Sequence, residues 1–116
     1  MRIAKLEKER VLTCMENVKE LDKAIERIDE AEALYGEGRV YGALSKISSA
    51  FTLIALAYSK GKINKEEFRE IINHISVLRN KIVEKRKLEE VLTIIDIVRG
   101  KIADIMFNNF AKCIID

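Results

Sequence analysis

Residues 40–59 read VYGALSKISSAFTLIALAYS, and this stretch decides the fold. Apolar residues recur in it at steps of four and three, which is the period of an α-helix with one buried face. Alanines and further leucines lie between them and extend the apolar surface around the circumference. We therefore predict a helix over 39–59 that is the most buried of the protein. The apolar residues spaced by four and three along it are Val40, Leu44, Ile47, Phe51, Ile54 and Tyr58.

Turn signals bound this helix on both sides. Gly36 and Gly38 precede it, and two glycines so close together favour a helix end and a tight turn. After the segment 59–63, Asn64 is followed three residues later by Glu67, which is the spacing of a helix N-cap with its reciprocal partner. A further helix is therefore predicted to begin at this asparagine.

Helical periodicity covers the rest of the chain. The segment 91–98 is rich in β-branched residues and would suit a strand in isolation, but the length of the surrounding pattern favours a helix. No proline interrupts any of these stretches. We predict an all-α protein, an antiparallel bundle of four principal helices near 3–34, 39–59, 65–85 and 88–114.

Length and composition limit the class of protein. The 116 residues suit one domain, 1–116, and 48% hydrophobic with 34% charged residues excludes a disordered chain. The net charge of +2 is too small for a protein specific for duplex DNA. No apolar run suggests a signal peptide or a membrane span, so we expect a cytoplasmic protein without a membrane role. Abundant lysine and glutamate without glutamine indicate a thermophilic source.

Cys14 and Cys113 lie near opposite ends of the chain, which contains a single histidine. Without a CxxC spacing or further ligands, no metal site and no cofactor are predicted. The two cysteines are interpreted as small buried residues. The alternative is a disulfide that joins the first helix to the last, which is chemically permitted inside some hyperthermophiles.

Arg79 is the most informative single residue. On a helix it falls about 40° from Ile75, among the apolar residues of the third predicted helix. A guanidinium on such a stripe needs an acidic partner or opens onto an interface or cleft. Alternatively, its methylenes lie on the edge of the core while its head reaches water.

The segment 78–84 reads Leu-Arg-Asn-Lys-Ile-Val-Glu and, with the helix order from Tyr58 to Ile97, resembles the HEPN superfamily of helical bundles, in particular toxin-like members paired with minimal nucleotidyltransferases. Ala31, Tyr35, Gly38, Ala43 and Ala50 are similar to the alanine-spaced helix pair of that superfamily. The resemblance implies site residues Arg79 and Asn80 at the two-fold axis of a homodimer that cleaves RNA without a metal.

Glu84 stands where that family has its catalytic histidine. A solvated carboxylate is ionised near neutral pH and has no proton to donate. We therefore predict a non-catalytic dimeric helical-bundle module that binds a protein partner or RNA. The alternative is a HEPN-type ribonuclease toxin.

Two further sets of residues are candidates. Arg69 and His74 repeat the spacing of arginine, four residues and a possible acid-base group, although His74 also suits the flank of the apolar stripe. The helix pair around 31–50 also looks like the two-helix units of MIT and tetratricopeptide-type adaptors, which bind partner helices in grooves. The last helix is apolar on more than one face, which predicts a homodimer interface at Ile94, Ile97, Met106, Phe107 and Phe110.

Overall fold

The computed structural model describes residues 2–115, and the side chains of residues 7–115. The chain forms five helices, and no strand occurs within this part of it. The all-α prediction is confirmed, and the strand-like segment 91–98 lies inside a helix. The bounds of the helices are α1 Arg2–Asn17, α2 Lys19–Gly36, α3 Val40–Ser59, α4 Lys65–Val83 and α5 Leu88–Ile115.

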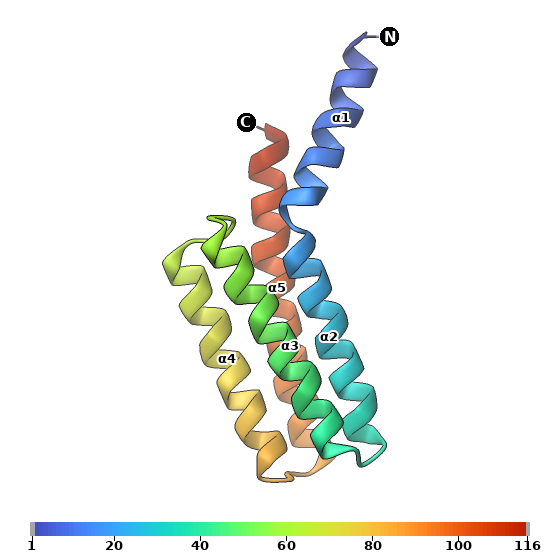
Figure 1. Ribbon diagram of the computed structural model, residues 1–116, viewed down its shortest axis with the longest axis vertical. Coiled ribbons are helices and arrows are strands. Elements are labelled where there is room, and N and C mark those ends of the chain that lie inside the picture. Colours follow the sequence, from blue (N-terminus) through green and yellow to red (C-terminus); the bar gives the residue numbers. More distant parts are fainter. Residues whose placement is uncertain (1, 116) are drawn as a thin grey trace.

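Helices α2 to α5 lie side by side, and successive helices run in opposite directions (Figure 1). Helix α1 continues beyond them and lies beside the C-terminal part of α5, so that both chain ends are at the same end of the molecule. The shape is accordingly elongated, with extents of 55 × 27 × 20 Å.

The predicted helix over 3–34 is wrong, because the chain breaks at Val18 and forms α1 and α2. Val18 has φ −109° and ψ 9°, and neither proline nor glycine stands near it. Glu20 and Asp22 lie in the first turn of α2, where carboxylates are stabilised by the positive end of the helix dipole. The break turns α1 toward α5, where Cys14 and Cys113 form a disulfide with their Cα atoms 5.6 Å apart. The interpretation as two free buried cysteines is therefore wrong.

The core lies between α2, α3, α4 and α5, and α2 packs most extensively against α3. The prediction of which α3 residues face the core is only partly right. Ile47 and Ile54 are buried, whereas Phe51 and Tyr58 are exposed. The buried strip instead contains Ala43, Ile47, Ala50, Ile54 and Ala57.

Helix α4 begins as predicted. The amide of Asn64 donates to Glu67 Oε1 at 2.9 Å, and the amide of Glu67 donates to Asn64 Oδ1 at 2.8 Å. The reciprocal pair satisfies two amides that have no partner within the helix. The helix ends at Val83 instead of 85, because Lys85 takes φ 55° and the chain turns into α5.

One helix within residues 2–115, α3, is long and apolar enough to cross a membrane by length and composition, so the expectation that no segment reaches this limit was wrong. These two properties are weak evidence for a span, because the core helix of a soluble protein has them as well. Helix α3 packs against both α2 and α4, and this packing accounts for its apolar composition.

A buried carboxylate holds the junction of α1, α2 and the α3–α4 turn together. The side chain of Glu20 is 3% exposed, and it accepts hydrogen bonds from Lys62 Nζ at 2.6 Å and Lys60 Nζ at 3.3 Å. Asn109 Nδ2 of α5 donates to the carbonyl of Lys62 at 3.2 Å. Burial alone would raise the pKa of the Glu20 carboxyl, but the lysine hydrogen bonds and charges outweigh it, so that this pKa is lowered from 4.5.

Glu20→Gln is expected to lower the free energy of unfolding at neutral pH by about 1–3 kcal/mol, because two lysines lose a charged acceptor. Since the folded-state pKa of Glu20 is lowered, its contribution is present above the unfolded value and is lost as the pH falls through the folded pKa. The gap between wild type and variant, measured by urea unfolding, should therefore narrow below pH 4.5. Glu26→Gln, at an exposed position of α2, is the control. A gap that stays constant into strong acid would contradict this role of Glu20.

Candidate groove between α3 and α4

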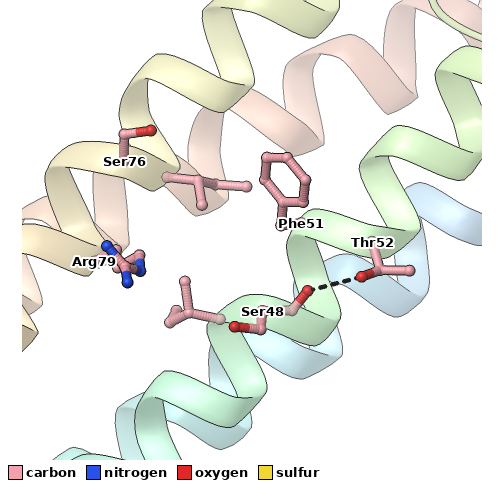
Figure 2. A pocket seen from close by; sticks show the side chains of 7 residues that line it. Ser48, Phe51, Thr52, Ser76 and Arg79 are labelled. Carbon is pink, nitrogen blue, oxygen red and sulfur yellow. Dashed lines mark hydrogen bonds between the residues drawn. The ribbon is translucent and has the colours of Figure 1, made fainter.

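A groove of about 330 Å³ lies between α3 and α4. Its apolar floor consists of the buried side chains of Ile47 and Ile75, one from each helix. Figure 2 shows Arg79 and Ser76 on α4 across the groove from the labelled side chains of α3. The remaining lining residues are Ser48, Phe51, Thr52, Ser76 and Arg79.

Short polar side chains keep the groove open. Ser48, Thr52 and Ser76 are exposed and have too little volume to fill the space between the helices. The Thr52 hydroxyl donates to the carbonyl of Ser48 at 3.1 Å, so that it is satisfied by its own helix. Phe51 is 43% exposed at the rim. The groove therefore has an apolar floor and offers an aromatic ring to a bound molecule.

An aromatic pair joins α3 and α4 close to the α3–α4 turn. The rings of Tyr58 and Phe68 stack with their centroids 4.4 Å apart and their planes inclined by 9°. The groove lies apart from this pair, because its lining spans residues 47–52 on α3 and 75–79 on α4, a rise of about 6–8 Å along each helix. This length corresponds to about one to one and a half turns of a helix.

Arg79 is exposed at the groove and makes no ion pair with any residue whose side chain is described. Ile75, which the sequence places close to it on the helix, lines the same groove. Arg99 provides a contrast, because its guanidinium pairs with Asp29, Glu32 and Asp96 and joins α5 to α2. The donors of Arg79 are therefore available to a carboxylate or phosphate from outside the chain.

The other predicted site residues do not gather around Arg79. Asn80 is exposed on α4, and Glu84 is exposed at the C-cap just after it. Arg69 is exposed and His74 is half-buried. Within each pair, Arg79 with Glu84 and Arg69 with His74, the spacing of five residues corresponds to about 140° around a helix. One chain thus does not bring either arginine and its proposed acid-base group to a single face.

The predicted interface residues of α5 also differ in burial and lie apart along the helix. Ile94 and Met106 pack against the core as partly buried residues. Ile97 and Phe107 are exposed, and Phe110 is half-buried. Ile97 lies ten residues before Phe107, about 15 Å away along the helix. The α5 residues therefore do not form one continuous patch.

The sequence did not lead us to predict that residues of α3 line a groove with Arg79. Ser48 and Thr52 are spaced by four, and this pair of small hydroxyl residues in an otherwise apolar helix was the available signal. Phe51 was assigned to the core because its spacing matches that of Ile47 and Ile54. Hydropathy alone does not distinguish a ring at the edge of a core from one inside it.

No family model, no curated protein and no solved structure matches this chain. Its class is therefore defined by fold and groove, as an all-helical protein with an amphipathic groove between two neighbouring helices. Within residues 2–115, no three histidine, cysteine or acidic side chains are grouped so that they could hold a metal ion.

Arg79→Ala is expected to change the free energy of unfolding by no more than about 0.5 kcal/mol, because an exposed side chain without an ion pair is removed. Arg99→Ala is the matched comparison and should cost roughly 1 kcal/mol or more, since a network of three carboxylates loses its cation. Thermal and urea unfolding measure both changes. An Arg79→Ala loss as large as that of Arg99→Ala would mean that a carboxylate of the chain holds Arg79.

Proposed function

We propose that this chain is a non-catalytic binding module, an antiparallel bundle of helices α2 to α5 that holds an amphipathic helix of a protein partner in the groove between α3 and α4. The observation that carries the proposal is Arg79, which makes no ion pair among the described residues, at the rim of a groove with an apolar floor, about one and a half helical turns long. Helix-in-groove recognition uses apolar anchors spaced by three, four and seven residues. Ile47, Phe51 and Ile75 would contact these anchors.

Charge favours an acidic partner residue beside the apolar anchors. The guanidinium of Arg79 can donate two parallel hydrogen bonds to one carboxylate, which fixes orientation as well as adding affinity. Binding of RNA is supported less, because RNA affinity comes from several phosphate contacts and Arg79 is the only charged residue that lines the groove. Catalysis by the HEPN-type residues is supported less as well, since Glu84 has a carboxylate where that family has an imidazole.

The partner can be sought with displayed libraries of amphipathic helices selected on the wild type. We expect enrichment of apolar residues at i and i+4 together with an acidic residue. Arg79→Ala should weaken an enriched peptide roughly tenfold or more, through loss of a charge-assisted hydrogen bond. Arg79→Glu should select basic residues in place of the acidic one.

Arg69→Glu is the matched control, because it makes the same charge change on α4 at an exposed position that does not line the groove. If Arg69→Glu alters the selection as strongly as Arg79→Glu, the groove is not the binding site. Incubation with total RNA tests the enzyme alternative directly. RNA degradation by the wild type that Arg79→Ala abolishes would overturn the non-catalytic proposal.

A further inference from the structure

The part of α1 from residue 7 onward and residues 102–115 of α5, whose first half still packs on the core, are here called the stem. In Figure 1, α1 and the C-terminal part of α5 extend together beyond α3 and α4. Helix α1 packs against α5 and, less extensively, against α2. The disulfide between Cys14 and Cys113 fixes the two helices of the stem side by side.

One face of the stem is apolar and open to water. Leu12 and Met15 of α1 line a groove of about 500 Å³ together with Met106 of α5, so both helices contribute to the same face. Leu12 is 56% exposed, Met15 is 54% exposed and Phe107 is 69% exposed.

The α5 side of this face has a regular spacing. Its residues alternate by four, three and four along the helix, so that they lie within about 60° of one another. This is the spacing of the seam between paired helices. The residues are Ala103, Phe107, Phe110 and Ile114.

The stem carries few charged residues. Residues 102–115 contain only Asp104 and Lys112 as charged residues. In α1 from residue 7 onward, the acidic Glu7, Glu9 and Glu16 outnumber Lys8 and Arg10 by one, so that the stem carries a net charge of −1. A helix that lies on a membrane surface is rich in lysine and arginine on its polar face, and the stem lacks this excess.

The accessible surface is larger than a compact chain of this mass requires. The protein exposes 7540 Å², whereas a monomer of this mass typically exposes about 6,500 Å². The radius of gyration is 15.9 Å, compared with about 13.4 Å for a compact domain of this length. The difference of roughly 1,000 Å² is similar to the share that one partner buries in a standard interface, about 800 Å².

We propose that the stem is the surface through which two copies of this chain associate, with the apolar face of one stem packed against that of the other about a two-fold axis. The four helices then form a second small bundle, in which Leu12, Met15 and Phe107 are removed from water. The net charge of the stem is only −1 per copy, so that repulsion between two approaching stems is weak. This surface is separate from the groove at Arg79, so either proposal can fail without the other.

Sedimentation equilibrium on the wild type under oxidising conditions should give a dimer. Phe107→Glu, and independently Met15→Glu, should raise the dimer Kd about tenfold or more, because each places a charge in the buried seam. Both side chains are exposed in the single chain, so circular dichroism of the variants should be unchanged. Ile97→Glu is the matched control, since Ile97 is an exposed apolar residue of α5 outside the stem. It should leave the Kd unchanged.

A wild type that stays monomeric over the accessible concentration range would overturn the proposal. A dimer that both stem variants leave intact, or that Ile97→Glu disrupts as strongly, would equally overturn it. An assembly that grows beyond two copies would contradict the closed two-fold arrangement.

Discussion

Side-chain volume along the contact between α2 and α3 is the constraint on which the rest of the structure depends. Helices α2 and α3 together have five fully buried alanines, and on each helix they are spaced by seven residues. Larger buried residues, such as Ile28 and Ile47, occupy the alternate positions. A seven-residue repeat of small and large side chains lets two helices pack closely along their whole length at a small crossing angle. The alanines are Ala24, Ala31, Ala43, Ala50 and Ala57.

This contact determines where the groove and the stem are. Phe51 and Ser48 lie about 100° and 160° around α3 from Ala50, and both line the groove that α3 forms with α4. Small hydroxyl residues at that edge leave space, and the space becomes the groove. At the N-terminal end of α2, the chain breaks at Val18. The break lets Glu20 contact the lysines of the α3–α4 turn, while α1 packs along α5. The α2–α3 contact thus ends near Val18, at the edge of the core. Helix α1 continues beyond this point and forms the stem with α5.

Interactions between residues close in the chain, such as a helix cap, could be predicted from the sequence. Which of two possible faces of a helix is buried could not. The Asn64 cap was predictable because its two partners are only three residues apart. On α3, the strip with Phe51 and the strip with Ala50 both have helical period, and only the closeness of α2 favours the smaller residues. The break at Val18 has no glycine or proline to indicate it, and its determinants lie some forty residues away, at Lys60 and Lys62. The place of Arg79 beside Ile75 follows from one helix alone, but its neighbours on α3 depend on how two helices meet.

The most direct test of this account is the free energy of unfolding of Ala50→Leu, measured by chemical denaturation beside Ala33→Leu. Both substitutions add the same atoms, one in the buried α2–α3 contact and one at an exposed position of α2. Overpacking at Ala50 is expected to cost about 1–3 kcal/mol or more, because α2 and α3 would have to move apart. Ala33→Leu should stay within about 0.5 kcal/mol of the wild type. Equal stabilities of the two variants would contradict the claim that close approach of α2 and α3 organises the protein.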